Sequence, residues 1–343
     1  MNNYTTLAFN RYFYGNVVGK PITFVILSKG TGAGVQKIQL QVTKDITLTV
    51  DGTARFYDNA AGTINPTTRR TAHADGWQVF YLKVPSGTSN LTFSDENKVK
   101  YWGSTNWIEY GYWNDGWEGL TANHPCLTGN LLGFTKLKSF YIAGNNTFSF
   151  NLNTISHLTE LEEFSVDDDL ASFKNTVFGD VVDLPRSLKL MLLIGNTVVG
   201  GKASDLPPNM KGIILYGANT LSGAINDISK RIKFFYIAGL NTLSGNISDF
   251  GPDADDFLIQ GNNTINNYTG KVWPKQMFAF VFTPVGAGGL DAAEVDALFN
   301  DLALSTFGVG YVMTITGTNA APTVASLVAR NSIIAQGVVL STN

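Results

Sequence analysis

The same pattern of apolar and polar positions occurs twice in residues 211–245. The unit from Ile213 to Gly223 returns from Phe235 to Gly245 at an offset of 22 residues, in the form apolar-x-apolar-x-Gly-x-Asn-Thr-Leu-Ser-Gly. The alternation in its first half predicts a short strand, and the glycine and asparagine predict the turn that follows. A fixed period of this length indicates a solenoid, in which each turn adds one strand to a parallel sheet.

The same unit recurs on both sides of this stretch. Its first apolar position falls at Leu137, Leu161, Leu188, Met210, Ile232 and Ala254, at intervals of 24, 27, 22, 22 and 22 residues. A seventh, degenerate unit begins near Met277. The sequence therefore predicts a solenoid over residues 118–283.

Each unit resembles a leucine-rich repeat, L-x-x-L-x-L-x-x-N-x-L. One unit matches this spacing without a gap, at Leu188, Met191, Leu193, Asn196 and Val198. Other units carry one more residue before the asparagine, at Asn146, Asn219, Asn241 and Asn263. The N-T-L-S-G-x-I half resembles plant-type repeats. The resemblance implies an α/β solenoid, and we expect these five asparagines to form a column that bonds the backbone of the turns.

Strand residues between the core positions should face the concave side of the solenoid. This surface includes a candidate binding surface at Tyr141, Leu192, Ile214, Tyr216, Phe234, Tyr236 and Leu258. A monomer seldom exposes a contiguous apolar patch of this kind. Either a partner, a sister subunit or another domain covers it, or the predicted strand register is wrong by one residue; we expect a partner or subunit.

The two ends of the chain follow other patterns. Residues 21–117 alternate apolar and polar positions in short runs between turn residues, whereas residues 1–20 show no strong period. We predict a β-sandwich-like attachment domain over residues 1–117. The last part of this domain is rich in Trp and Tyr. These aromatic residues fit either a sugar-stacking platform or, in our preferred interpretation, an interface that caps the first repeat.

Residues 284–343 predict a closing unit. A helix is expected from Gly289 to Phe299, with Asp291 and Glu294 in capping-box spacing. A strand at 311–316, a second helix from Ala321 through Ala335 and a last strand at 338–340 complete it. The fold class is thus mainly β with a repeat solenoid: a β-sandwich-like domain, a leucine-rich-repeat-like α/β solenoid and an α/β C-terminal cap.

Composition narrows the function. The net charge is −3, so a basic stripe for nucleic acid is not expected. Cys126 is the single cysteine, which excludes an intrachain disulfide and a cysteine metal cluster. No secretory signal and no apolar run of membrane-spanning length is present, so no membrane insertion is expected. We predict no catalytic site, no metal and no cofactor.

Two acidic runs leave alternatives open. Residues 167–169 are three aspartates that suit a cation or a solvated turn. Asp253, Asp255 and Asp256 are candidates for a glycosidase site, which needs paired carboxylates on opposite sides of a sugar cleft.

The C-terminal unit carries a second resemblance. L-D-A-A-E-V-D-A-L-F-N-D-L-A, I-T-G-T-N-A-A-P-T and A-R-N-S-I-I-A-Q-G-V resemble the C-terminal end of structural proteins of bacteriophages that infect Bacteroidota. This implies a non-enzymatic virion surface protein (spike, fibre or head decoration), made in the host cytoplasm, that recognises a host surface glycan or protein. Its expected partners are sister subunits, with a trimer as one expected form, and other virion proteins. A bacterial leucine-rich-repeat adhesin and, less favoured, a polysaccharide-degrading spike are the alternatives.

Overall fold

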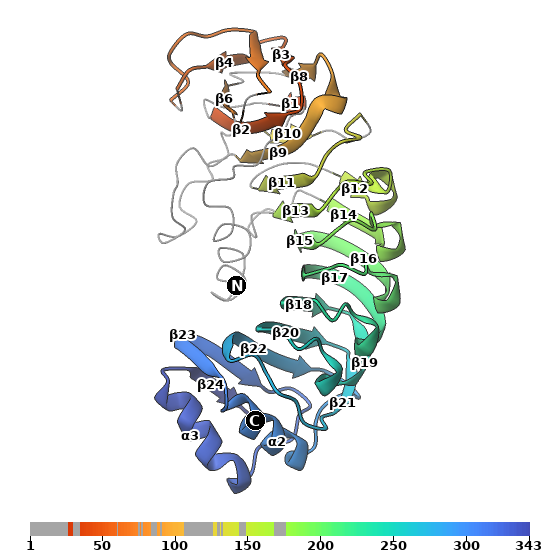
Figure 1. Ribbon diagram of the computed structural model, residues 1–343, viewed down its shortest axis with the longest axis vertical. Helices are drawn as coiled ribbons and strands as arrows, with labels where there is room; N and C mark the ends of the chain where they lie inside the picture. Colours follow the sequence, from red (N-terminus) through yellow and green to blue (C-terminus); the bar gives the residue numbers. More distant parts are fainter. Residues whose placement is uncertain are drawn as a thin grey trace.

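The computed structural model describes residues 27–29, 35–59, 61–74, 76, 78–83, 88–89, 91–105, 126–128, 131, 133–143, 149–167 and 176–343. These residues form an arch of stacked strands with a β-rich unit at one end and two helices at the other (Figure 1). The repeated turns predicted from the sequence make up the arch.

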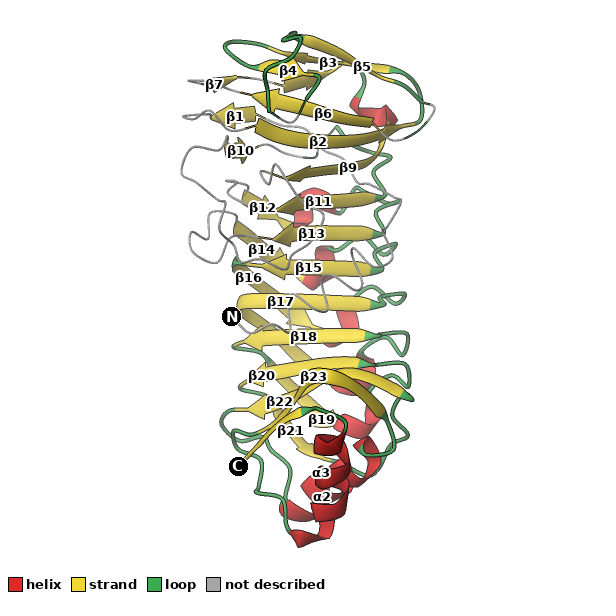
Figure 2. Ribbon diagram, turned by 90° about the vertical axis from the view of Figure 1, so that its left-hand side faces the viewer, coloured by secondary structure: helices red, strands yellow, loops and turns green. Residues whose placement is uncertain are grey.

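The inner side of the arch is one long sheet. Its parallel part comprises β9 (Val99–Thr105), β11 (Ser139–Ala143), β13 (Glu163–Asp167), β15 (Leu190–Ile194), β17 (Gly212–Ala224), β18 (Phe234–Gly239), β20 (Asp256–Gly261), β22 (Gln276–Pro284), β23 (Thr306–Ile315) and β24 (Val339–Thr342). The strands lie side by side across the arch (Figure 2).

A second parallel sheet runs behind the first. It comprises β12 (Ser149–Asn151), β14 (Thr176–Asp180), β16 (Asn196–Lys202), the second half of β17, β19 (Thr242–Asn246) and β21 (Thr264–Asn267). A short 3-10 helix follows in most turns: η3 (Leu152–Ile155), η4 (Val181–Asp183), η5 (Ala203–Asp205), η6 (Ile225–Asp227) and η7 (Ile247–Asp249). Each turn therefore runs from inner strand to outer strand to 3-10 helix.

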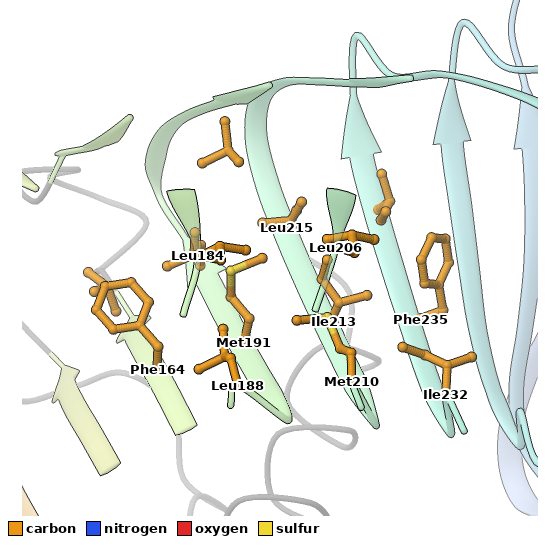
Figure 3. Packing of buried hydrophobic residues seen from close by; sticks show 14 of the residues in the cluster. Phe164, Leu184, Leu188, Met191, Leu206, Met210, Ile213, Leu215, Ile232 and Phe235 are labelled. Carbon is orange, nitrogen blue, oxygen red and sulfur yellow. The ribbon is translucent and has the colours of Figure 1, made fainter. Parts of the chain in front are cut away.

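The core lies between the two sheets. Each predicted first apolar position, from Leu137 to Ala254, has no exposed surface. Figure 3 shows the interior in close-up, with Leu188, Met191 and Phe235 among the packed side chains. Stacking is what buries these residues, because a single turn has no opposite layer of its own.

Glycine makes the turn after the first apolar run of β15, β17, β18 and β20, at Gly195, Gly217, Gly239 and Gly261. Gly239 has a φ of 131°, and a Cβ on it would lie 2.4 Å from the carbonyl oxygen of Gly217 in the preceding turn. Gly261 repeats this contact with Gly239 at 2.2 Å. The glycines are needed both for the backbone angle and for the close approach of successive turns.

The N-terminal unit shares the inner sheet. Its antiparallel strands are β2 (Val35–Val42), β4 (Arg55–Tyr57) and β6 (Gln78–Lys83), and β2 pairs with β9. Because β9 also pairs with β11, the sheet continues across the domain boundary predicted at residue 117. A second sheet contains β3 (Ile46–Val50), β5 (Arg69–Ala72) and β8 (Leu91–Phe93), and a third contains β1 (Leu27–Lys29), β7 (Thr88–Ser89) and β10 (Cys126–Thr128).

The C-terminal unit closes the other end. Helix α2 (Ala292–Leu302) begins with the predicted capping box: Glu294 N donates to Asp291 Oδ1 and Asp291 N donates to Glu294 Oε2, both at 2.9 Å. The predicted second helix is divided into η8 (Val324–Ser326) and α3 (Leu327–Ala335). Asp296 of α2 accepts a hydrogen bond from Thr323 N at 2.9 Å and another from the Ser326 hydroxyl, so the two helices are held together at the start of η8.

Candidate functional site

The strand register predicted for the concave face is confirmed. Residue pairing runs from Tyr141 to Ser165, Leu192, Ile214, Tyr236 and Leu258 across six neighbouring strands. Val281 of β22 continues the row. We call these seven residues, from Tyr141 to Val281, the concave row.

The concave row is buried within the single chain. Leu192 and Ile214 have no exposed surface, Tyr236 is 1% exposed and Leu258 is 2% exposed. Together with Tyr141, Ile194, Phe234 and Val281 they form an apolar cluster separate from the core between the sheets. The inner sheet is therefore buried on both faces, as is usual for parallel sheets.

Side chains near the row interlock between strands. The ring of Phe234 occupies the space beside Gly212, where a Cβ would lie 1.9 Å from its Cζ. The hydroxyl of Tyr236 donates to Asp256, which is 2% exposed. The Ser139 hydroxyl donates to Glu163 Oε2 at 2.8 Å. Tyr236 and Ser139 thus have bonded partners on neighbouring strands, whereas the buried hydroxyl of Ser165 in the concave row has none.

This burial changes the interpretation of the candidate binding surface. Of its seven residues only Tyr216 is more than 9% exposed, and it packs against the buried cluster. The expected exposed apolar patch is not present at these positions, and no second subunit is needed to bury them. The sequence argument for an oligomer that rested on this patch is removed.

The predicted asparagine column is present in three consecutive turns. Asn219, Asn241 and Asn263 are fully buried. Their Oδ1 atoms accept hydrogen bonds from the backbone N–H of Val199, Leu221 and Leu243, at 3.0, 2.8 and 2.9 Å. Each asparagine therefore bonds the backbone of the preceding turn and links the stack.

Two members of the predicted column need comment. Asn146 lies outside the described residues. Asn196 is exposed, so its assignment to the column was wrong; Thr197 occupies the place, 2% exposed, and its hydroxyl donates to the Tyr216 carbonyl at 2.8 Å. The physical reason is the turn geometry. Asn219, Asn241 and Asn263 each stand two places after a turn glycine, and Thr197 stands two places after Gly195.

Sequence reasoning missed one further member. Asn319 follows Gly317 in the same Gly-x-Asn spacing and is 4% exposed. Its Oδ1 accepts from Leu290 N at 2.9 Å, and its Nδ2 donates to the carbonyls of Phe282 and Thr316 at 3.1 and 2.7 Å. The spacing was visible in the sequence and would have extended the column into the closing unit.

The two carboxylates in the row before the concave row are too far apart to form a glycosidase pair. Glu163 and Asp256 lie in one row of the inner sheet, but β15, β17 and β18 separate their strands. Four strand intervals correspond to about 19 Å, against about 5–10 Å for paired catalytic carboxylates. Within the described residues no group of three His, Cys, Asp or Glu could hold a metal ion, and Asp168 and Asp169 are outside this part of the chain.

A row of lysines was missed altogether. Lys138, Lys189, Lys211 and Lys233 each stand immediately before an inner strand, and Lys100 is the second residue of β9. A ladder of backbone hydrogen bonds joins them. It runs from Lys100 to Lys138, then through Glu162 to Lys189, Lys211 and Lys233, with N–O distances of 2.7–2.8 Å. We call these five residues the lysine column. Its signal was the 22-residue interval of Lys189, Lys211 and Lys233.

The column affects its surroundings electrostatically. The hydrogen bond from Lys136 lowers the pKa of Glu160, and the charges of Lys138 and Lys100 act in the same direction. Lys189 forms an ion pair of 2.7 Å with Glu162. No ion pair joins Lys211 or Lys233 to a carboxylate of the described residues. This edge is therefore a positive strip on a negatively charged protein.

The start of the closing unit holds a different kind of lysine. Burial and the nearby charge of Lys230 lower the pKa of Lys271 to about 8. Its ammonium donates to the Gly251 carbonyl at 3.0 Å and lies 5.0 Å from the Trp273 ring centroid. Next to it, burial and a 2.6 Å hydrogen bond to Asp301 raise the pKa of Tyr268. These contacts serve packing.

No family model and no curated protein matches the chain. Among solved structures, a crystal structure of PEPR1-AtPEP1 aligns with 56% of this chain and 34% of that chain, at 16% sequence identity and a TM-score of 0.32. This chain thus spans about a third of the length of that structure. Among the described residues, no helix has the length and apolar character needed to cross a membrane.

Proposed function

We propose that this chain is a non-enzymatic recognition protein whose solenoid binds a component of a cell surface. The observation that carries the proposal is the separation of structural from outward positions within each turn. In the Gly-x-Asn step the glycine and the column residue build the fold. The residue between them is exposed and varies freely, as Asn196, Ala218, Leu240, Asn262 and Thr318.

This separation suits recognition. Leu240 is 56% exposed at a position where the next turn has Asn262, so the surface changes while the backbone turn does not. Solenoids use such outward positions to present a long rigid binding surface. A fixed scaffold also avoids the ordering entropy that a flexible binding loop would lose on association.

The virion setting of this proposal rests on the C-terminal resemblance alone. In that setting the chain is a spike, fibre or head decoration of a bacteriophage. The N-terminal unit attaches it to other virion proteins or to sister subunits, and the solenoid meets a host surface glycan or protein.

The test is binding of the fluorescently labelled chain to intact bacteria, including Bacteroidota, with light scattering on the same sample to give its oligomeric state. We expect saturable binding to some strains that excess unlabelled chain abolishes. Binding no stronger than that of an unrelated protein of similar charge, on every strain and with purified surface glycans, would reject the proposal.

A further inference from the structure

The lysine column occupies equivalent places in successive turns. Lys189, Lys211 and Lys233 precede three neighbouring strands, and their backbones are joined by Lys211 N to Lys189 O and Lys233 N to Lys211 O hydrogen bonds of 2.7 Å. Neighbouring strands are about 4.8 Å apart. The three backbones therefore place positive side chains at regular intervals along one edge of the sheet.

The middle of the column carries uncompensated charge. Lys211 and Lys233 are exposed, and neither forms an ion pair with a described carboxylate. Arg231, also exposed, stands two residues before Lys233 and donates to Asn209 Oδ1 at 3.2 Å, which leaves its charge unpaired by that contact. Like charges at this spacing repel, and a bound anion would remove the repulsion.

Glu162 and Asp255 occupy the lysine position in the two turns that flank the three lysines, as the backbone bonds Lys189 N to Glu162 O and Asp255 N to Lys233 O show. A second set of acidic residues stands on the outer side. Asp183, Asp205, Asp227 and Asp249 each occupy the third position of a 3-10 helix, again at 22-residue intervals. The turns of Lys189, Lys211 and Lys233 thus have a lysine at the entry to the inner strand and an aspartate (Asp205, Asp227 or Asp249) on the outer side. The net charge of −3 conceals this polarity.

We propose that the lysine column binds a linear acidic polysaccharide, with carboxylate or sulfate groups of the glycan chain seated along Lys189, Lys211 and Lys233. The proposal rests on the proposed function, since it names the class of surface component that the solenoid recognises. A single straight strip of charge matches an extended, single-chain polyanion whose anionic groups recur along its length.

The side chains favour this ligand over nucleic acid. Lysine is a flexible, strongly hydrated point charge that tolerates carboxylate and sulfate alike, without the rigid fork of arginine. Single-stranded nucleic acid sites combine positive charge with aromatic platforms for the bases. At the two exposed turns, the residues following Lys211 and Lys233 are Gly212 and the buried Phe234, which offer no exposed ring.

The experiment measures binding of the full chain to sodium alginate and to dextran sulfate at low and high salt, with neutral dextran and single-stranded oligothymidine for comparison. The test variant is Lys211→Gln/Lys233→Gln. The matched control is Lys44→Gln/Lys202→Gln, which removes the same charge from exposed lysines in other parts of the surface. Thermal melts of both variants check that the fold is kept.

We expect at least one acidic polysaccharide to bind the native chain, more weakly as salt rises. The test variant should lose about five- to tenfold in affinity, as two exposed charge contacts would give, while the control changes less than twofold. Lys211→Arg/Lys233→Arg should keep most of the affinity, because it keeps the charge.

Four results would overturn the proposal. The first two are no binding to either polyanion and equal losses in the test and control variants. The third is equally tight binding of oligothymidine. The fourth is a fall in molecular mass of the test variant, which would identify the column as a contact between copies.

Cell binding separates the two proposals. Saturable cell binding that Lys211→Gln/Lys233→Gln leaves unchanged rejects the lysine column and keeps the recognition function. Polysaccharide binding through the column without any cell binding keeps the lysine column and rejects the recognition function.

Discussion

The concave row and the lysine column cross the same strands three residues apart, yet the row is buried and the column is half-buried at Lys189 and exposed at Lys211 and Lys233. Lys211 and Ile214 belong to one turn, as Lys233 and Tyr236 belong to the next. Ile214 has no exposed surface, whereas Lys211 is exposed. The face of a parallel sheet and the edge where its strands begin are thus separate environments, and our proposals place recognition at the edge.

The largest expected effect tests the burial of the concave row. Ile214→Ser should lower the free energy of unfolding by about 4 kcal/mol, because it leaves a cavity and buries a hydroxyl. Urea denaturation followed by circular dichroism measures it. Lys211→Ser, in the same turn, should change the free energy by about 0.5 kcal/mol or less. Similar small effects of both substitutions would mean that the concave row is open to solvent.

The asparagine column supplies the next contrast, between a buried and an exposed asparagine. Asn241→Ala removes the acceptor of the Leu221 N–H bond, and we expect a loss of about 2 kcal/mol, because a buried donor is left unpaired. Asn196→Ala should cost less than about 0.5 kcal/mol, since Asn196 is exposed. Denaturant midpoints of the two variants decide this, and equal losses would restore Asn196 to the column.

A smaller effect is expected where the concave row meets a carboxylate. Tyr236→Phe keeps the ring in place but removes the hydroxyl that donates to Asp256. We expect a loss of about 1.5 kcal/mol, the lower end of the range for a hydrogen bond to a charged group. Asp256→Asn measured in the same background gives the coupling between the two residues. A coupling near zero would show that the bond contributes nothing to stability.

The smallest effect contrasts a half-buried lysine with the exposed column. The pKa of Lys271 is lowered to about 8, so between pH 8 and its ordinary value of 10.5 the unfolded chain binds more protons than the folded one. Stability should therefore rise with pH from about 8, by on the order of 0.5 kcal/mol after solvent screening. The raised pKa of Tyr268 acts oppositely only above its ordinary value of 10, because the folded state then retains the proton.

Thermal melts between pH 7.5 and 10 test this titration. The rise should disappear in Lys271→Met and persist in Lys211→Gln, whose lysine is exposed. A rise of the same size in Lys271→Met would assign the titration to another group.

Much of the architecture followed from local pattern. The 22-residue period predicted the stacked strands and their register, because each unit repeats the same apolar alternation and the same turn residues. The capping box of α2 followed from Asp291 and Glu294 for the same reason, since it is a contact between residues three apart. The Gly-x-Asn spacing in the sequence was enough to exclude Asn196 from the asparagine column and to include Asn319 in it.

The candidate site was harder to predict. The inner strands contain continuous apolar runs, such as 190–194 and 234–237, which are typical of parallel strands buried on both faces. Alternation was used instead to assign every second residue to an open concave surface. The lysine column was overlooked because its members are 22 residues apart and become neighbours only through the stacking.

By itself, then, the sequence determined the repeated turn: which residues enter the core, where the chain reverses, and which positions pair between turns. These depend on contacts within one unit or between identical units. Only the tertiary structure decided which face is solvated, because burial depends on everything that packs against a side chain. It also decided that Lys189, Lys211 and Lys233 form one surface, because electrostatic neighbours are set by distance in space and not by distance along the chain.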